Sequence, residues 1–303
     1  MYKLSEYTVF GLQTVVEGSF CWPRLMIGES LDPNSLVFVM NADYFDRAYN
    51  DDNVSCIICS EQIQNHIPAL AKKGIAISTN PKFSFYSIHN SIVLNSDKCK
   101  NRKTVIGNNT QIHTSSIVAN EGVIIGNDCI IEENVIIRSG TQIGDNTVIR
   151  AGSIIGTDND LNYYNNEDDL CAIESGGTVL IKNNCEIGYY TTIARGMMID
   201  ERTIIEDHVF IGAKVAIGHN VVIGRNSDVV DGTQICGYTT IGHDSHIAPQ
   251  SIISNKLKLG NSVYVTIGSC VVNNLKSGSI VAGNFAIDKE KFMKWHLRKI
   301  RNQ

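Results

Sequence analysis

The sequence has little proline, few aromatic residues, little charge and no long apolar run. Of its 303 residues, 5 are proline and 2 are tryptophan, aromatic residues make up 7%, and charged residues make up 19%. Hydrophobic residues make up 43%, as in folded globular proteins, so an intrinsically disordered chain is excluded. The net charge of −5 provides no general positive field for a phosphate backbone, which argues against general nucleic-acid binding.

The start of the chain and its cysteines predict a cytoplasmic protein. No window of about 18 apolar residues is present, so we expect no membrane-spanning helix. The first residues, MYKLSEYTVFGL, lack both the basic and the apolar segment of a signal peptide. The nine cysteines are odd in number and scattered, unlike a disulfide framework, and Cys56 and Cys59 have no second pair at zinc-ligand spacing. We therefore expect reduced thiols and no metal site.

Aliphatic residues recur every six positions over most of the chain. From Ile181 to Val271 each sixth residue is Ile, Val or Leu without a break. Two earlier registers run over 106–118 and 125–155, and the step of seven between them indicates a one-residue bulge. Neither the helical period of 3.6 nor the alternation of a flat strand produces a strict six. The pattern is therefore an internal structural repeat.

A period of six fits a short strand followed by a turn, and three such units close one triangular coil. The aliphatic residue points inward and stacks on its equivalent in the next coil, roughly 4.8 Å away. An ordinary β-sandwich would show irregular spacing of about 8–12 residues. We therefore predict a mainly β protein whose residues 101–284 form a parallel β-helix of about eight coils.

Two segments outside the repeat are expected to form their own structures. Residues 1–100 are predicted to be a small α/β domain, because strand-like and helix-like stretches alternate there. The strands are expected at 37–40, 54–59 and 74–78, and the helices at 43–50, 61–73 and 83–93. Within the array, residues 156–180 are too polar and aperiodic for a coil. This loop is expected either to line a groove or to be a plain surface excursion.

Residues 285–303 are expected to contain a helix that begins at Asp288 and has Phe292, Trp295 and Ile300 on one face. Its cations far outnumber its single acid, Glu290. They are Lys289, Lys291, Lys294, Arg298, Lys299 and Arg301. Two interpretations are open: a solvated helix packed on the end of the coils, or a docking surface for an acidic partner.

His219 is the strongest candidate for chemistry within the array. It lies in a turn, two residues after the inward Ile217 in A-I-G-H-N-V-V-I-G. Gly237 follows three repeats later, at the same phase of the next coil, so its backbone N–H is expected beside the imidazole. A base next to a backbone donor can serve acyl transfer, since one takes the proton and the other stabilises the oxyanion. The alternative is a polar turn residue without a catalytic role.

Several segments resemble the UDP-3-O-acylglucosamine N-acyltransferases of the lipid A pathway, which are hexapeptide-repeat acyltransferases. In the array these are T-T-I-A-R-G (191–196), D-E-R-T-I-I-E-D (200–207) and I-G-H-N-V-V-I-G (217–224). In the first domain they are F-V-M-N-A-D-Y (38–44) and S-T-N-P-K-F-S-F-Y (78–86). The resemblance covers nearly the whole chain, although the C-terminal tail is shorter than the family's helical extension.

The resemblance implies a left-handed β-helix, a homotrimer and a nucleotide-binding first domain. It makes His219 the general base that deprotonates the sugar amine, and Gly237 the N–H donor to the oxyanion. It also implies that Phe38 and Tyr44 sandwich the nucleotide base, with Asn41 near the sugar or phosphate. Two aromatic rings around a base would supply about 1–3 kcal/mol of stacking. A plain core role for Phe38 is the alternative.

The chain departs from the family at Ala194, Ala216 and Lys256, where the family usually has an acid, a Gln and a His. Lys256 is our candidate for contact with the acyl donor, which the resemblance implies to be acyl-CoA or acyl carrier protein, with no permanently bound cofactor. Because these positions surround the acyl channel in the family, a long hydroxyacyl chain does not follow. The closing segment 278–288 looks more like that of sugar acetyltransferases that use coenzyme A.

We therefore predict an N-acyltransferase that acylates the amine of a nucleotide-linked amino sugar, for lipopolysaccharide or surface-glycan synthesis. A coenzyme A-dependent sugar O-acetyltransferase is the alternative. Two further classes are weighed against these. A zinc enzyme like the γ-carbonic anhydrases would use His243 and His246, whose spacing is too short for that family. A non-catalytic scaffold would bind no nucleotide.

Overall fold

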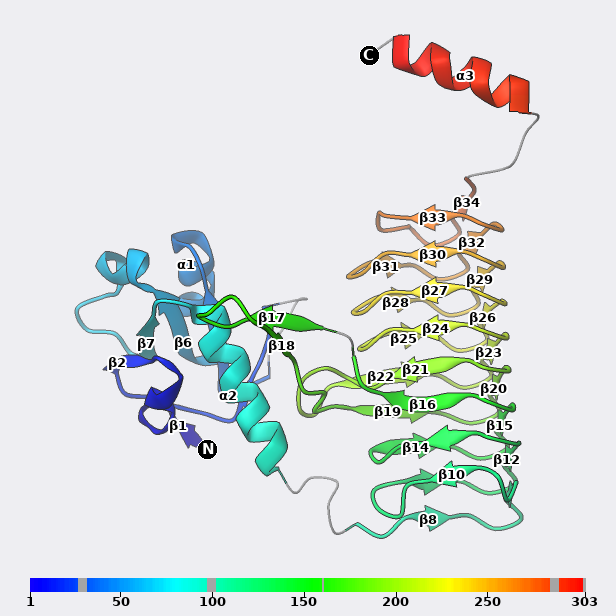
Figure 1. The fold of residues 1–303 in the computed structure, drawn as a ribbon, viewed down its shortest axis with the longest axis horizontal. Helices are drawn as coiled ribbons and strands as arrows, with labels where there is room; N and C mark the ends of the chain where they lie inside the picture. Colours follow the sequence, from blue (N-terminus) through cyan, green and yellow to red (C-terminus); the bar gives the residue numbers. More distant parts are fainter. Residues whose placement is uncertain (27–31, 97–101, 160, 284–288, 302–303) are drawn as a thin grey trace.

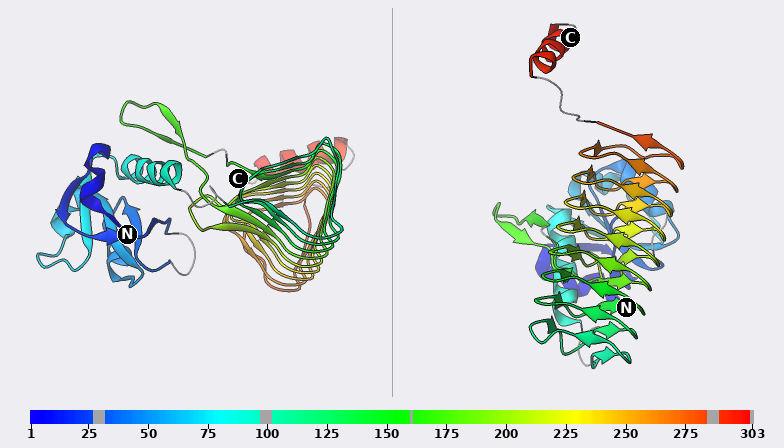
Figure 2. Two further views of the ribbon diagram at one scale, coloured as in Figure 1. Left: turned by 90° about the horizontal axis from the view of Figure 1, so that it is seen from below. Right: turned by 90° about the vertical axis from the view of Figure 1, so that its right-hand side faces the viewer.

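The computed structural model describes residues 1–26, 32–96, 102–159, 161–283 and 289–301. An N-terminal domain lies beside a tall stack of coils, and a C-terminal helix follows the last coil (Figure 1). Seen along its axis, the stack has a triangular outline (Figure 2). The structure thus confirms the predicted fold class, a parallel β-helix with a small α/β domain and a terminal helix.

Three parallel sheets form the sides of the triangle. Sheet 1 consists of β10 (Ile117–Val118), β13 (Ile136–Ile137), β16 (Ile154–Thr157), β21 (Thr192–Ala194), β24 (Ala216–Ile217), β27 (Gln234–Ile235), β30 (Ile252–Ile253) and β33 (Cys270–Val271). Sheet 2 consists of β8 (Val105–Ile106), β11 (Ile124–Ile125), β14 (Thr141–Ile143), β19 (Thr178–Ile181), β22 (Arg202–Ile205), β25 (Val222–Ile223), β28 (Thr240–Ile241) and β31 (Lys258–Leu259). Sheet 3 consists of β9 (Gln111–Ile112), β12 (Ile130–Ile131), β15 (Val148–Ile149), β20 (Glu186–Ile187), β23 (Phe210–Ile211), β26 (Asp228–Val229), β29 (His246–Ile247), β32 (Tyr264–Val265) and β34 (Ile280–Val281).

The aliphatic repeat forms the core of the stack. Ile217 pairs with Ile235, three repeats later, and the side chains at these positions are almost completely buried. Each buried Ile contributes about 1.5–3 kcal/mol. Non-glycine residues at the turns adopt left-handed backbone angles, such as Asn220 with φ 59° and Lys256 with φ 62°. The triangular outline therefore results from one inward residue in every six and one tight turn at the end of each side.

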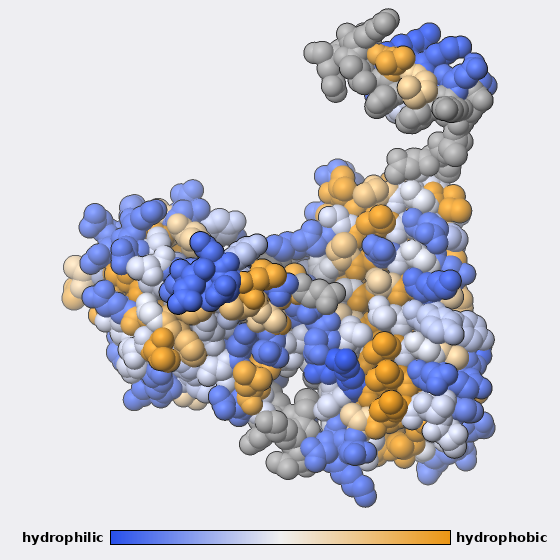
Figure 3. Space-filling model, in the orientation of Figure 1, coloured by the Kyte–Doolittle hydropathy of each residue, from blue (hydrophilic) through white to orange (hydrophobic). Residues whose placement is uncertain are grey.

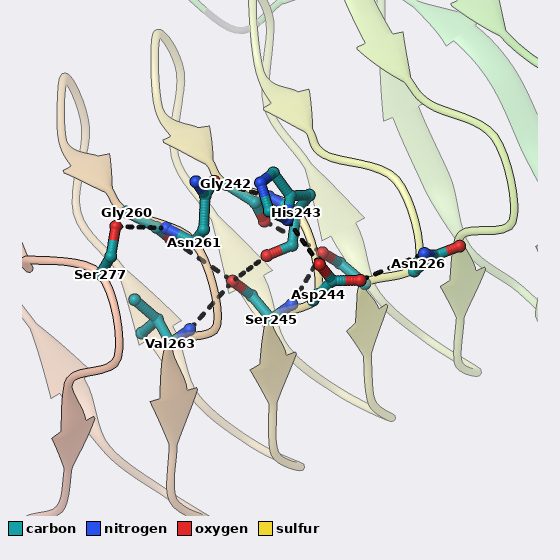
Figure 4. A network of polar contacts seen from close by, with 10 residues as sticks. Asn226, Gly242, His243, Asp244, Ser245, Gly260, Asn261, Val263 and Ser277 are labelled. Atoms are coloured by element: carbon teal, nitrogen blue, oxygen red, sulfur yellow. Dashed lines mark hydrogen bonds and ion pairs between the residues drawn. The ribbon is translucent and has the colours of Figure 1, made fainter.

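Side-chain hydrogen bonds tie neighbouring coils together at the corner between sheets 2 and 3. Asn226 donates to the Asp244 carboxylate over 3.1 Å, and the backbone N–H of Val263 donates to Ser245 Oγ over 3.2 Å (Figure 4). Asn261 N–H donates to Ser277 Oγ over 3.0 Å. These polar ladders satisfy backbone groups that the short strands leave unpaired.

One coil contains an insertion that does not interrupt the six-residue period, so periodicity did not predict it. β19 pairs with β22 at a spacing of four repeats rather than three, with Ile181 opposite Ile205. The extra residues leave the stack as a loop, residues 195–201, and Ile199 is buried against the N-terminal domain instead of inside the coils. Our prediction of Ile199 as an inward coil residue was therefore wrong. Because the insertion equals one full repeat, the register continues unchanged on either side of the loop.

The N-terminal domain is a five-stranded sheet with helices. The strand order is β2 (Gln13–Val16), β7 (Gly74–Ser78), β6 (Val54–Ser60), β5 (Ser35–Val39) and β4 (Trp22–Pro23), and only β2 is antiparallel to its neighbour. A two-stranded pair, β1 (Tyr2–Lys3) and β3 (Ser19–Phe20), lies beside η1 (Leu4–Phe10). The remaining elements are α1 (Ala42–Asn50), η2 (Glu61–His66) and α2 (Pro81–Asn95).

The helix predicted at 61–73 is much shorter in the structure. Only the 3-10 turn η2 forms, and it ends at His66, because the next residue, Ile67, has an extended ψ of 122°. Ile67 precedes Pro68, and a residue before proline is forced out of the helical region by the pyrrolidine ring. Ser60 is the N-cap residue of η2, but its side chain makes no capping hydrogen bond.

Residues of the predicted loop 156–180 form a hairpin that reaches the N-terminal domain. Its strands are β17 (Asn162–Tyr164) and β18 (Leu170–Ala172), and Tyr163 is 5% exposed. The Tyr163 ring lies 5.4 Å from that of Tyr86 on α2. Farther along α2, His89 Nε2 hydrogen-bonds the carbonyl oxygen of Glu174 over 2.9 Å. The hairpin therefore joins the domain to the coils.

The C-terminal helix is α3 (Lys289–Arg301). Its described side chains are all exposed, including Met293, Trp295 and Leu297, so for these residues the structure contradicts a helix packed on the coil stack. The predicted first residue, Asp288, and the side chains of Phe292 and Ile300 lie outside the described residues. None of the described helices is long and apolar enough to cross a bilayer.

Candidate active site

Two irregular features and the His219 turn lie at one corner of the triangle, where the chain passes from sheet 1 to sheet 2. The hairpin leaves the stack there between β16 and β19, and the loop 195–201 leaves it between β21 and β22. The turn that carries His219 lies one coil farther, between β24 and β25. Because parallel coils stack in register, these features are neighbours in space.

His219 and Gly237 are in direct contact, as their equal phase predicts. A Cβ atom added to Gly237 would lie 2.4 Å from His219 Nε2 and 2.6 Å from Cε1. Glycine is therefore required for the imidazole to lie this close to the backbone of the next coil. The Gly237 carbonyl accepts from Lys256 N–H over 3.0 Å, whereas the Gly237 N–H has no acceptor among the residues that the structure describes.

Asn220 fixes the proton on the His219 ring. Asn220 Oδ1 accepts from the backbone N–H of Met197 over 2.9 Å, and its Nδ2 donates to a carboxylate oxygen of Glu201 over 2.7 Å, so the amide has one orientation. The same Oδ1 lies 3.1 Å from His219 Nδ1. A nitrogen that faces an oxygen acceptor must carry the hydrogen. Nδ1 is therefore protonated, and Nε2 keeps its lone pair.

Burial keeps the imidazole neutral. Burial lowers the pKa of His219 below its ordinary value, while the hydrogen bond to Asn220 and the charge of Glu201 act in the opposite direction. The ring also packs edge-to-face against Tyr238, with ring centroids 5.1 Å apart. A neutral, oriented imidazole with a free lone pair on Nε2 is equipped to accept a proton at pH 7.

A cavity of about 300 Å³ opens beside His219 on the outer face of sheet 1. Such a volume is at the lower end of the range for ligand pockets. The lining comprises Thr157, Asp158, Asn159, Leu161, Thr192, Ala194, Ala216, Ile217, Gly218, His219, Gln234, Ile235 and Cys236. Residues 157–159 and Leu161, where the hairpin leaves the stack, thus line a groove. Gly237 is buried behind the imidazole and is not itself a lining residue.

The predicted nucleotide-binding residues lie on β5 and at the start of α1, but the structure does not bring them into one stack. The Phe38 ring is half-buried and 4.9 Å from Phe85, so it packs on the domain core. Asn41 Oδ1 accepts from the backbone N–H of Tyr44 over 3.0 Å and so caps α1. The Tyr44 ring is 45% exposed and lies 5.2 Å from the Arg47 guanidinium. No ring contact joins Phe38 to Tyr44 among the described residues.

Lys256 lies in the turn one coil beyond Tyr238, on the same corner as His219. Its backbone is tied to Gly237, and its side chain is exposed. It is therefore close in the fold to the candidate base, and its predicted role toward an acyl donor stays a prediction.

His243 and His246 point to different acidic partners. His243 Nδ1 lies 2.5 Å from the Asp244 carboxylate at the corner shown in Figure 4. His246 Nδ1 lies 2.6 Å from Asp228 on the outer face of sheet 3, and its ring stacks on Tyr264. Within the described ranges, no three His, Cys, Asp or Glu side chains gather closely enough to hold a metal ion.

Comparison with known proteins agrees with the coil architecture. Residues 122–157 match the family model described as bacterial transferase hexapeptide, six repeats. This match and the register of three repeats per coil decide the architecture. The coils of this chain are built from hexapeptide repeats.

Solved structures similar to this hexapeptide-repeat protein include three acyltransferases. A UDP-N-acetylglucosamine acyltransferase is 20% identical and has a TM-score of 0.54 over 64% of this chain and 73% of its own. One from Campylobacter jejuni is 20% identical, with a TM-score of 0.52 over 63% and 77%. One from Arabidopsis is 19% identical, with a TM-score of 0.50 over 60% and 68%. At these identities the likeness shows the shared left-handed β-helical fold.

The sequence alone did not predict three residues around the candidate base His219, namely Asn220, Tyr238 and Glu201. Asn220 and Tyr238 directly follow the two predicted residues and are themselves three repeats apart, so coil phase could have found them. Glu201 could not be found in this way, because the insertion removes it from the coil register. Glu201 and Asn220 lie in the segments D-E-R-T and H-N that carry the resemblance. The sequence does not indicate that these two side chains contact each other.

Proposed function

We propose that this protein is an acyltransferase that moves an acyl group from a thioester donor to the amine of a nucleotide-linked amino sugar. The observation that carries the proposal is the His219 imidazole, neutral and oriented by Asn220, beside a cavity. The acyltransferases that share the fold support the reaction class. The substrate and the donor are inferences from the resemblance of the motifs.

The proposed reaction needs one proton acceptor and one oxyanion donor. The sugar amine attacks the thioester carbonyl carbon, a C–N bond forms, and the amine proton passes to His219 Nε2. The carbonyl oxygen becomes an oxyanion, for which the Gly237 N–H is the proposed donor. The intermediate collapses, the C–S bond breaks, and the imidazolium returns the proton to the leaving thiolate. The products are an amide and a thiol.

We assign nucleotide binding to the N-terminal domain, with Phe38, Asn41 and Tyr44 as the proposed contacts. The exposed Tyr44 ring beside Arg47 is suited to a nucleobase near a phosphate. Since Phe38 packs on Phe85, its proposed contact with the base would use the half-exposed part of its ring. Thermal-shift titration with UDP and dTDP tests this, and the absence of any shift would favour a non-catalytic scaffold.

The acyl donor is proposed to be acyl-CoA or acyl carrier protein, with Lys256 as a donor contact. The basic, exposed helix α3 supports an acidic carrier protein as the partner. The double variant Lys294→Glu and Arg298→Glu should raise the KM for acyl carrier protein and leave that for acetyl-CoA unchanged. An equal effect on both donors would remove the proposed role of α3.

A homotrimer in a reducing cytoplasm is part of the proposal. Apolar residues on the outer faces of the first coils, such as Ile117 and Ile124, are 63% and 49% exposed, and Figure 3 shows apolar surface over these coils. Such surface is usually buried in an assembly. Eight described cysteines are free thiols, which suits a reducing compartment. Analytical ultracentrifugation measures the oligomeric state.

A panel of substrates tests the function directly. Nucleotide-linked amino sugars and their hydroxyl counterparts are offered with acetyl-CoA and with acyl carrier protein, and products are identified by mass spectrometry. The alternative, a coenzyme A-dependent sugar O-acetyltransferase, predicts an ester on the hydroxyl acceptor. His219→Ala should reduce turnover about 10²- to 10⁴-fold while the fold is retained. Full activity of this variant would refute the proposed mechanism.

A further inference from the structure

The loop 195–201 brings a carboxylate to the corner that carries His219. β22 returns to the stack one repeat later than a regular coil would, and Glu201 is the last residue before it. One oxygen of Glu201 accepts three hydrogen bonds: from Asn220 Nδ2 over 2.7 Å, from Tyr238 OH over 3.0 Å and from the backbone N–H of Met198 over 3.0 Å. Three donors on one oxygen hold the carboxylate in a single position.

Glu201 is linked to the Nδ1 side of the base through Asn220. The bond from Asn220 Nδ2 to Glu201, together with the one from Met197 N–H to Oδ1, presents Asn220 Oδ1 to His219 Nδ1. Without an acceptor at Glu201, the amide could rotate and the imidazole would lose its fixed proton on Nδ1. Tyr238 supports the same carboxylate. Burial is the main cause that raises the pKa of the Tyr238 hydroxyl, and the charge of Glu201 raises it further. The hydroxyl therefore stays a donor.

The N-terminal domain holds this loop in place. Met197, Met198 and Ile199 are at most 1% exposed and belong to the cluster that contains Phe85 and Tyr86 of α2. The backbone N–H of Met197 donates to Asn220, and that of Met198 donates to Glu201. Packing of the domain on the loop therefore sets the positions of two donors in the network.

We propose that Glu201 is a positioning residue for His219 and that the contact between the N-terminal domain and the loop 195–201 sets the tautomer of the base. The substrate-binding domain of the proposed function would then complete the catalytic geometry of the β-helix. The catalytic part of this statement rests on the proposed function, whereas the tautomer is a property of the protein alone.

The test is ¹⁵N NMR of histidine-labelled protein, because ring nitrogen shifts report which nitrogen carries the proton. In the wild type, His219 should be the Nδ1–H tautomer. Glu201→Ala removes the acceptor, so the signals should move toward a mixture of both tautomers. Glu201→Gln keeps an oxygen for the three donors but removes the charge, so the tautomer should persist. Glu206→Gln, which removes a carboxylate paired with Lys182 on the surface, is the matched control and should change neither.

Titration in the same experiment separates charge from orientation. The Glu201 carboxylate raises the pKa of His219 against the effect of burial, so Glu201→Gln should titrate at lower pH than the wild type. Other groups near the ring stay unchanged in this comparison. They are Tyr238, Asp158 and Cys236, with Tyr86 and Arg24 beyond Tyr238. Any acid limb in the pH dependence of kcat/KM should shift in the same direction.

The domain contact is tested by Ile199→Ala, which alters packing without touching the hydrogen bonds. It should shift His219 toward the tautomer mixture, whereas Ile204→Ala in β22 should not. If Glu201→Ala fails to fold, Tyr238→Phe replaces it, since this removes one of the three donors. Loss of kcat/KM of about 10- to 100-fold is expected for Glu201→Ala. An unchanged tautomer and pKa in Glu201→Ala or in Tyr238→Phe would overturn the proposal, even if the protein proved to have another activity.

Discussion

Replacing Gly237 by alanine should disable the base while leaving the coil stack intact. The new Cβ would lie 2.4 Å from His219 Nε2, 2.6 Å from Cε1 and 2.9 Å from Cδ2. Ordinary contacts are about 3.5–4.0 Å, so the imidazole must move by about 1 Å. A displacement of that size typically costs about 100-fold in rate, which corresponds to about 2.7 kcal/mol of transition-state stabilisation.

The backbone should tolerate the alanine. The φ of Gly237 lies outside the left-handed region, so the substitution carries no conformational strain of its own. The ring can tilt toward the cavity, which limits the stability loss to about 1–3 kcal/mol. Gly283→Ala is the matched control, because nothing lies within 4 Å of its new Cβ. Its kcat/KM should equal that of the wild type.

A double-mutant cycle isolates the contact. The assay is kcat/KM for the acyl acceptor in the wild type, Gly237→Ala, His219→Ala and the double variant. Once His219 is alanine, no ring remains for the new Cβ to meet, so Gly237→Ala should cause no further loss. Wild-type kcat/KM in Gly237→Ala would refute the close packing of the two residues. A full additional loss in the double variant would show that Gly237 acts independently of the ring.

Three further predictions concern pH and the domain contact. Burial lowers the pKa of His219, so kcat/KM should rise with pH, with a midpoint below 6.5; a midpoint above 7 would contradict the neutral base. Burial, together with the charge of Arg24, lowers the pKa of His89 to about 4, whereas the unfolded residue is protonated below about pH 6.5. As pH falls from 6.5 to 4, the wild type should therefore lose up to about 3 kcal/mol of unfolding free energy relative to His89→Gln, measured by urea unfolding. Tyr163→Ala should destabilise the domain contact by about 3 kcal/mol in urea unfolding, whereas Tyr164→Ala, at a side chain 60% exposed, should stay within about 0.5 kcal/mol; equal effects would contradict the packing on α2.

The coil architecture was predictable because its core has a strict chemical requirement. Each coil admits one inward aliphatic side chain per six residues, and the pairing of Ile217 with Ile235 follows from that rule. The meeting of His219 with Gly237 follows from the same spacing, since coil phase converts sequence distance into contact. Any property that repeats with the coils can be predicted in this way.

The departures from regularity were not predictable from the period. An insertion of one full repeat preserves the register, so Ile199 was assigned to the core although it packs on the N-terminal domain. The contact of His89 with Glu174 joins residues 85 positions apart, and no local pattern encodes it. Strand alternation alone could not show whether the Phe38 ring contacts a nucleobase or a core residue. In the structure it packs on Phe85.

The irregular segments explain why the candidate site lies where it does. A uniform β-helix presents equivalent turns along each edge, so periodicity alone does not single out one of them as a site. At the corner between sheets 1 and 2, the hairpin and the loop 195–201 break this equivalence, and both are anchored by side chains that are buried against α2. The loop supplies Glu201 next to the turn whose imidazole meets a glycine one coil away. The repeat thus provides the contact between base and glycine, and the domain contact provides the asymmetry that orients the base.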